Sequence, residues 1–200
     1  MKIEDGQSYT GEIFDGVAVG DRSVRSCHFE GCSFEGGQFS KKEWADCRFA
    51  DCRFAGADLS VSRFFDSRMY GVEFFECKVT GVDWALLDGS SIILSAPFSF
   101  ESCDLSFSNF SDMKLMEMVV HDCKVQDVDF TQCDLSRSDF YRSDLKGSRF
   151  VNTALNGANF EEAFDYEISP LENSIEDARF TFPEVLSLLS AFQIKIAGIE

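Results

Sequence analysis

The stretch CDLSRSDFYRSDLKG, residues 133–147, contains one five-residue pattern three times: a small residue, Asp, a large apolar residue, then two mostly polar positions. Working outward from it, every fifth residue stays large and apolar in two runs. The first run is Phe14, Val19, Val24, Phe29, Phe34, Phe39, Trp44, Phe49, Phe54, Leu59, Phe64, Met69, Phe74, Val79 and Trp84; the second is Phe100, Leu105, Phe110, Leu115, Val120, Val125, Phe130, Leu135, Phe140, Leu145, Phe150, Leu155 and Phe160. Neither the helix period of 3.6 nor the strand period of 2 gives a strict five, so the pattern predicts stacked repeats.

Two residues before each of these central positions the side chain is usually small, and we call this the inner small position. Strand-like alternation points it inward together with the central residue, while the other three residues of each unit face water. All eight cysteines occupy it: Cys27, Cys32, Cys47, Cys52, Cys77, Cys103, Cys123 and Cys133. Since there is no Cys-x-x-Cys pair, we expect buried free thiols in a reducing compartment rather than zinc ligands or disulfides.

These units resemble the pentapeptide repeat family, whose consensus is a small residue, Asp or Asn, Leu or Phe, and two polar positions. The resemblance covers residues 12–162 and is best at Ala57–Val61, Cys133–Arg137, Ser143–Gly147 and Ala158–Glu162. It implies an all-β fold, a right-handed quadrilateral parallel β-helix with four units per coil. Twenty-eight units would make about seven coils. Residues twenty apart would then stack in columns such as Phe14, Phe34, Phe54 and Phe74; Phe110, Phe130 and Phe150; and Leu115, Leu135 and Leu155.

The predicted organisation has five segments. They are a lead-in (1–11), a first repeat run (12–86), a phase-breaking segment (87–97), a second repeat run (98–164), and a C-terminal capping and dimerisation segment (165–200). The phase breaks because Trp84 and Phe100 are sixteen residues apart instead of fifteen, which predicts one extra residue. We interpret this segment, with a turn at Asp88-Gly89 and Pro97 near its end, as a bulge that kinks the shaft. A functional loop is the alternative.

The C-terminal segment is predicted to contain a helix and a short strand. Pro183 and Glu184 suit a helix start, and apolar residues then recur at helical spacing before residues 193–196 alternate like a strand. This surface could cap the last coil, as an open β-helix requires, or form a homodimer interface. We favour the dimer, through Val185, Leu188, Leu189, Phe192, Ile194 and Ile196.

Catalysis is not indicated. His28 and His121 fall at outward positions without convergent partners, and there is no nucleophile constellation or glycine-rich phosphate loop. We therefore expect no enzyme activity and no catalytic, cofactor or metal-binding residues. No apolar run approaches the ~20 residues that span a bilayer, and the N-terminus lacks a signal peptide's features, so we expect a cytoplasmic protein without membrane contact.

Several segments resemble a subgroup of that family, the bacterial proteins that protect type II topoisomerases from poisons: albicidin-resistance, microcin-immunity and quinolone-resistance proteins. These segments are Leu145–Ser148, Asn152-Thr153 and Phe182–Glu184, followed by an apolar helix and an Ile-rich end. The resemblance implies a C-terminal homodimer shaped as an acidic, DNA-mimicking rod whose partner is DNA gyrase or a related type II topoisomerase. The alternative is a structural or scaffolding pentapeptide repeat protein with an unrelated partner.

The charge provides a separate argument. Residues 12–162 carry 26 acidic and 15 basic residues, a net charge of −11. On a ~34 Å shaft this is one net charge per ~3 Å, about half the line charge of duplex DNA. Direct nucleic-acid binding by so acidic a chain is not expected.

Acidic residues occupy two outward positions of successive units. Asp112, Glu117, Asp122 and Asp127 lie two residues after the central position, and Asp129, Asp134, Asp139 and Asp144 lie one residue before it. We predict partner contacts from Asp127, Asp129, Asp134, Asp139 and Asp144. Alternatively, an Asp before the central residue only satisfies a turn.

Overall fold

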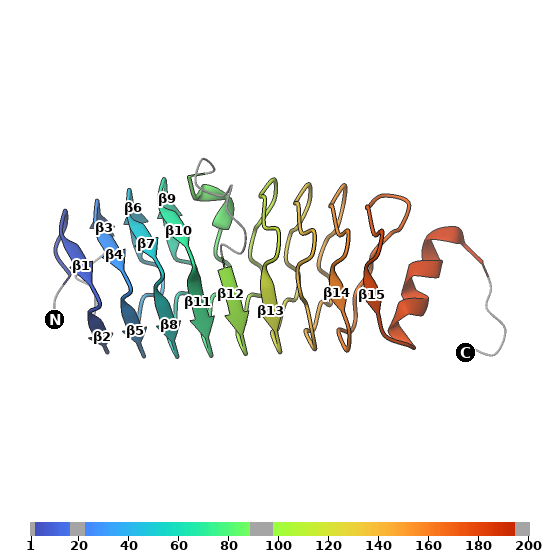
Figure 1. Cartoon of the computed structure of the whole chain (residues 1–200), viewed down its shortest axis with the longest axis horizontal. Helices are drawn as coiled ribbons and strands as arrows, with labels where there is room; N and C mark the ends of the chain where they lie inside the picture. The colour runs from blue at the N-terminus through green and yellow to red at the C-terminus, as the bar shows by residue number, and fades with distance from the viewer. Residues whose placement is uncertain (1–2, 17–22, 89–97, 195–200) are drawn as a thin grey trace.

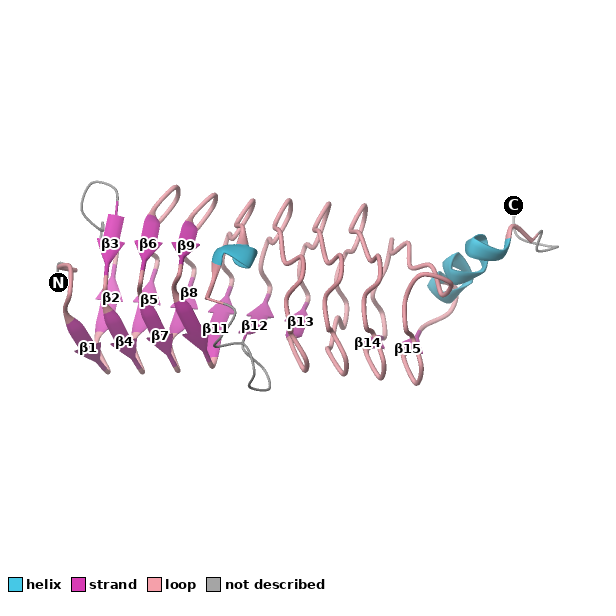
Figure 2. Cartoon of the chain, turned by 90° about the horizontal axis from the view of Figure 1, so that it is seen from above, coloured by secondary structure: helices cyan, strands magenta, loops and turns pink. Residues whose placement is uncertain are grey.

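The computed structural model describes residues 3–16, 23–88 and 98–194. It is a parallel β-solenoid of about eight turns with the two chain ends at opposite ends of a rod, as Figure 1 shows. The view from above shows the same stack of coils, with a helix beyond the last one (Figure 2). The β-helix that the resemblance implies is confirmed.

Strands line three sides of the N-terminal coils in parallel ladders. The first ladder is β1 (Ser8–Thr10), β4 (His28–Glu30), β7 (Arg48–Ala50) and β10 (Arg68–Tyr70); the second is β2 (Ile13–Asp15), β5 (Ser33–Glu35), β8 (Arg53–Ala55), β11 (Val72–Phe75), β12 (Phe98–Glu101) and β13 (Val119–His121); the third is β3 (Ser23–Arg25), β6 (Glu43–Ala45) and β9 (Arg63–Phe65). Nearer the C-terminus β14 (Asn159–Phe160) pairs with β15 (Arg179–Phe180). Phe14 lies opposite Phe34 and Phe34 opposite Phe54, so one coil takes twenty residues, or four units.

Large central residues fill the inside of the rod. Every central residue that the structure describes is at most 3% exposed. Rings twenty residues apart stack face to face: the Phe14 and Phe34 centroids are 4.9 Å apart at 14°, and those of Phe34 and Phe54 are 4.5 Å apart at 7°. The predicted columns are therefore present, and stacking like residues fills the interior without voids.

Most units turn a corner two residues after the central residue, and we call this the corner position. Its backbone φ is positive, the region that suits Gly and, less readily, Asp or Asn. Gly31 and Gly56 follow this rule, but Val61 (φ 57°) and Phe107 (φ 63°) occupy the same conformation with bulky side chains. The corners explain why glycine and acidic residues recur at this position.

The phase break differs from the expectation of one extra residue. Arg68 still contacts Asp88 at the normal separation of twenty, whereas Phe74 lies opposite Phe100, twenty-six residues later. Six residues are therefore added between Asp88 and Phe98. The sequence spacing is misleading because Trp84 and Phe100 lie on different sides of the coil, two units apart, and two regular units would take ten residues. The sixteen residues from Trp84, at the start of η1 (Trp84–Leu86), to Phe100 therefore include six additional ones. The alternative of a functional loop falls on residues 89–97, outside the described residues.

The C-terminal helix closes the end of the rod. This helix, η3 (Glu184–Phe192), is of the 3-10 type and begins directly after Pro183. Leu188 is 9% exposed and joins the core, with Val185 partly buried beside it. Gln193 ends the helix in the left-handed conformation, and the rest of the expected strand, Lys195-Ile196, lies outside the described residues.

All eight cysteines are buried and free, as expected. Their thiols donate to backbone carbonyls of the neighbouring coil, as from Cys133 Sγ to Phe110 O (2.8 Å). Ser143 Oγ donates in the same way to Val120 O, also at 2.8 Å. Cys and Ser therefore both recur at the inner small position, because both are small donors that link one coil to the next by a hydrogen bond.

The buried thiols predict a loss of stability at alkaline pH. Burial raises the pKa of Cys47 to about 12 and that of Cys52 to about 11, from 9.0. The folded state holds the thiol proton more tightly than the unfolded state does, and this contributes to the free energy of unfolding. Because the folded pKa is raised, this contribution is complete below pH ~9 and is lost as the pH rises toward the folded pKa values. We expect the urea concentration at the unfolding midpoint to decrease as the pH is raised from about 8 to about 10.5. We also expect a thiol reagent to react fully with the cysteines only after unfolding. A pH-independent midpoint, or rapid native labelling, would contradict this.

Candidate functional site

The four predicted aspartates that precede a central residue each hold a turn. Asp134 Oδ1 accepts hydrogen bonds from the backbone N–H of Ser136 (3.1 Å) and from its hydroxyl (2.6 Å). The backbone N–H two residues on also bonds Oδ1 of Asp129, Asp139 and Asp144. All four carboxylates are half-buried, and each uses one oxygen in this local turn. The turn role is thus present at every one of these positions.

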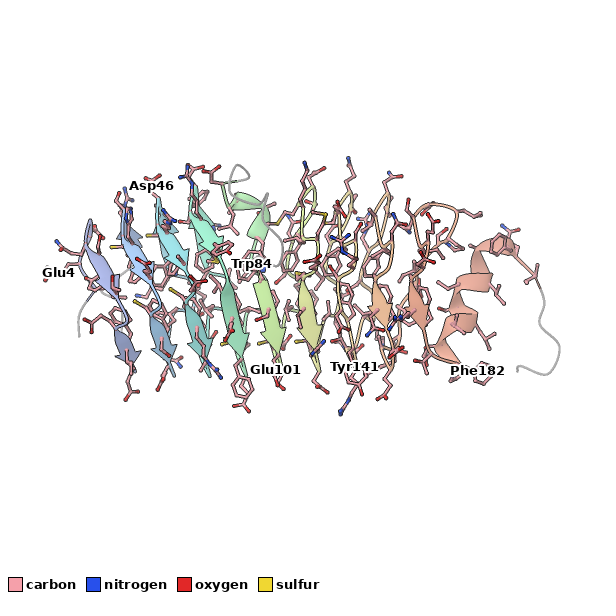
Figure 3. All side chains as sticks on the ribbon, viewed as in Figure 1. Glu4, Asp46, Trp84, Glu101, Tyr141 and Phe182 are labelled. Carbon is pink, nitrogen blue, oxygen red and sulfur yellow. The ribbon has the colours of Figure 1, made fainter. Side chains whose placement is uncertain are left out.

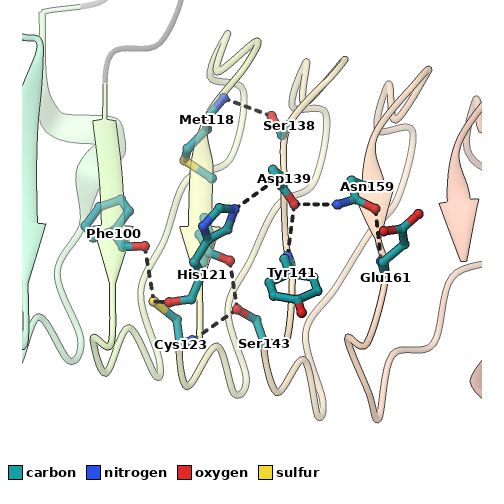
Figure 4. A network of polar contacts seen from close by, with 11 residues as sticks. Phe100, Met118, His121, Cys123, Ser138, Asp139, Tyr141, Ser143, Asn159 and Glu161 are labelled. Atoms are coloured by element: carbon teal, nitrogen blue, oxygen red, sulfur yellow. Dashed lines mark hydrogen bonds and ion pairs between the residues drawn. The ribbon is translucent and has the colours of Figure 1, made fainter. Parts of the chain in front are cut away.

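Asp139 is the most heavily engaged of the four (Figure 4). Its Oδ1 accepts from Asn159 Nδ2 at 2.8 Å, and its Oδ2 lies 2.8 Å from His121 Nε2. The expectation that His121 lacks a partner was wrong, because the two residues sit on adjacent coils of one ladder although eighteen residues separate them. The nearby Cys123 thiol and Ser143 hydroxyl both donate to backbone carbonyls, so they serve the stacking of the coils.

Some acidic side chains at corner positions form ion pairs with basic residues and others do not. Glu117 pairs with Arg137 at 2.9 Å, and Asp122 pairs with Arg142 at 3.0 Å. Asp112 and Asp127 are exposed and have no ion pair among the described residues. The Asp127 carboxylate lies directly above Gly147 of the next coil, so a Cβ added at Gly147 would clash with it. Of the five predicted partner-contact residues, Asp127 is therefore the one not committed to a turn.

The structure does not gather the five predicted residues into one patch. Successive units lie on successive sides of the rod, so Asp129, Asp134, Asp139 and Asp144 point in four directions. Successive residues stacked on one of these sides alternate in charge, so this side is largely neutral: Asp58, Lys78, Asp104, Lys124 and Asp144. The pKa of Asp58 reflects this pairing: burial raises it, but hydrogen bonds from Ser60 and the charge of Lys78 outweigh burial and lower it.

Acidity increases along the rod. Residues 23–88 hold 11 acidic and 8 basic side chains, residues 98–162 hold 12 and 6, and residues 163–194 hold 6 and 1. At ~4.8 Å per coil, residues 98–180, with 17 acidic and 7 basic side chains, carry one net charge per ~2 Å. Residues 23–88 carry one per ~5 Å. The C-terminal coils thus approach the ~1.7 Å spacing of duplex DNA, and the N-terminal coils do not.

The C-terminal end is both capped and apolar. Leu188 and Val185 face the core and Leu189 is half-buried, whereas Phe192 (49%) and Ile194 (56%) remain exposed. Phe182, labelled at this end in Figure 3, is 74% exposed and Leu171 is 66% exposed. Both were missed because they precede the helical spacing, and Ile196 lies outside the described residues. The six predicted interface residues thus divide between cap and free surface.

Comparison with known proteins identifies the repeat. Residues 90–160 match a family model described as a pentapeptide repeat region. Residues 90–160 are a pentapeptide repeat region. Full-length QnrB1, a plasmid-mediated fluoroquinolone resistance protein, matches it with a TM-score of 0.57 at 17% identity, over 96% of this chain and 99% of that chain.

Two further solved structures match the chain less well. A trypsin-treated QnrB1 variant has a TM-score of 0.47 at 19% identity, over 96% of this chain and 98% of that chain. HetL from the cyanobacterium Nostoc sp. strain PCC 7120 has 0.34 at 12%, over 88% and 85%. No curated protein sequence matches the chain. At these identities the likeness to full-length QnrB1 shows a shared fold.

The described residues hold neither a metal-ligating cluster nor a membrane-spanning helix. In residues 3–16, 23–88 and 98–194, no three His, Cys, Asp or Glu side chains are placed to hold a metal ion. Within the same residues, none of the helices has the length and apolar character needed to cross a membrane.

Proposed function

We propose that this protein is a DNA mimic that binds a bacterial type II topoisomerase, chiefly DNA gyrase, and protects it from a poison. Such protection would serve antibiotic resistance or self-immunity. The observation that carries the proposal is the line charge of the C-terminal coils, one net charge per ~2 Å over residues 98–180. The fold shared with a fluoroquinolone resistance protein supports it.

In this mechanism no bond is made or broken. A basic groove that binds DNA attracts the acidic coils, and the rod competes with DNA or destabilises the poisoned cleavage complex. Two of the six basic side chains of the second repeat run, Arg137 and Arg142, pair with corner acids of adjacent coils. The run nevertheless holds 12 acidic against 6 basic side chains, so it presents a net negative charge to a basic partner.

A supercoiling assay tests this function. Purified protein is added to DNA gyrase with and without a quinolone, an albicidin-like poison or a microcin. We expect it to inhibit supercoiling alone, to restore activity to poisoned enzyme, and to lose both effects as salt rises, because surface charges are screened. If it does neither with any of these poisons, the proposed function is wrong.

We also propose that two chains join through their C-terminal ends, and this predicts a clean monomer variant. Phe192→Lys places a charge on the exposed apolar end without touching the core, so sedimentation should change from dimer to monomer while the circular dichroism spectrum stays that of the wild type. Leu188→Lys is a poorer probe because Leu188 also caps the last coil. Phe107→Lys, at an exposed corner far from the end, is the control and should remain dimeric. A wild-type chain that is monomeric at micromolar concentration would leave the cap as the only role of this segment.

A scaffolding function is the second candidate. The charge-alternating ladder from Asp58 to Asp144 and the turn-holding aspartates explain many of the acids without any basic partner. The two functions differ in salt dependence: a scaffold that binds through apolar surface keeps its affinity as salt rises, and a DNA mimic loses it.

A further inference from the structure

A cavity of about 320 Å³ opens where the last coil meets η3. Its lining residues are Lys146, Gly147, Asp165, Tyr166, Glu167, Glu184 and Ser187. Three carboxylates thus surround it against one ammonium group. None of these four charged side chains forms an ion pair within the described residues, so their charges are free to act on a bound group.

Tyr166 adds an observation independent of the charges. The residue is 2% exposed, and its ring packs 5.8 Å from Phe160 and 5.6 Å from Phe180. Its hydroxyl is buried without a hydrogen-bond partner among the described residues, and the same holds for the hydroxyl of Ser187. Burying an unpaired hydroxyl costs stability, and both of these hydroxyls belong to residues that line the cavity, where a ligand would supply their partners.

The protonation state of Tyr166 fixes what it can offer. Burial, and then the nearby Glu184 carboxylate, raises the pKa of Tyr166 to about 12. At neutral pH the side chain is therefore a neutral hydroxyl that can accept a hydrogen bond as well as donate one. Glu184, at the start of η3, is half-buried beside it and supplies a charged acceptor.

We propose that this cavity binds the guanidinium group of an arginine side chain on a basic protein partner. A guanidinium carries five N–H donors in one plane, so it can bond a carboxylate and both hydroxyl oxygens at once. An ammonium group has three donors at one point and matches this arrangement less well. A metal ion is disfavoured, because the described residues contain no three-ligand group placed to hold one.

The position of the cavity fits such an anchor. It lies in residues 146–187, at the most acidic end of the rod, and Gly147 on its rim is the residue over which the Asp127 carboxylate leans. A basic partner drawn to the C-terminal coils would meet the cavity directly. The identity of the partner rests on the function proposed above, whereas the arginine chemistry does not.

The test uses the full-length protein and a small probe. N-acetyl-L-argininamide, which imitates an arginine within a protein chain, is titrated and followed by NMR, with N-acetyl-L-lysinamide and free L-arginine as comparators. We expect the arginine amide to bind best, since the ammonium is poorer in donors and the free carboxylate is repelled. Tyr166→Phe and Glu184→Gln should each weaken its binding about tenfold. The matched controls Tyr70→Phe and Glu30→Gln, on exposed residues of the first ladder, should leave it unchanged.

Tyr166→Phe has a second readout. Because it removes an unpaired buried hydroxyl and keeps the ring, it should raise the thermal midpoint of the free protein while it weakens arginine binding. Absence of arginine binding, or equal binding to Tyr166→Phe, Glu184→Gln and wild type, overturns the proposal even if gyrase is protected. Arginine binding that depends on both residues supports the cavity even if gyrase is not bound, in which case the proposed function alone fails.

Discussion

Replacing Phe130 with Ala is expected to lower the free energy of unfolding by about 3–5 kcal/mol. Phe130 is fully buried, and its ring stacks between those of Phe110 (5.4 Å) and Phe150 (5.2 Å). Backbone hydrogen bonds, such as that from Phe130 N to Arg149 O, fix the spacing of the coils above and below. The neighbours therefore cannot close the cavity that the substitution leaves. Urea denaturation followed by circular dichroism measures the change.

Phe107→Ala is the matched control, because the same side chain is removed from a corner where it is 65% exposed. Its stability should change by less than about 1 kcal/mol. Cys123→Arg should lower the free energy of unfolding by more than Phe130→Ala does, since it buries an unpaired charge at an inner small position. An unchanged midpoint for Phe130→Ala would contradict the inward assignment of the central residues.

The architecture was predictable because the five-residue repeat fits the twenty-residue coil a whole number of times. A strict five-residue period places each central residue inward, and twenty residues bring the next like residue above it. The stack of Trp84 on Phe110 shows where counting fails: their separation is twenty-six, and no period reveals which side of the coil carries the six added residues. The insertion is visible only through pairing.

The candidate sites were less predictable for a related reason. Asp134 before a central residue fits a turn and a partner contact equally well, and only its hydrogen bonds to Ser136 reveal the turn. Tyr166 lies in the coil after Glu162, where the five-residue pattern fades, so no spacing marks its ring as buried. His121 and Asp139 lie on adjacent coils and contact each other through outward positions, which the inward pattern does not describe.

Reversing two corner acids of the C-terminal coils is expected to weaken gyrase binding by about tenfold or more at low salt. The variant is Asp112→Lys with Asp127→Lys, and both carboxylates are exposed and unpaired among the described residues. Lys41, Arg137 and Arg142 already occupy corner positions at positive φ, so the backbone accepts a basic side chain there. Reversing Asp129, Asp134, Asp139 and Asp144 instead would remove four turn hydrogen bonds, and a loss of binding could then follow from misfolding.

The N-terminal coils offer an unusually close control for this variant. Asp46 and Asp51 are exposed corner acids at positive φ, and the Asp51 carboxylate leans over Gly71 as that of Asp127 leans over Gly147. Asp46→Lys with Asp51→Lys therefore makes the same change in net charge, in the same backbone setting, at the opposite end of the rod. If net charge alone attracted gyrase, both variants would bind equally weakly. Because the C-terminal coils hold the dense acidity, we expect only Asp112→Lys with Asp127→Lys to weaken binding, with the difference shrinking as salt rises. Equal binding by both variants in titrations at low salt would remove the C-terminal coils as the contact surface.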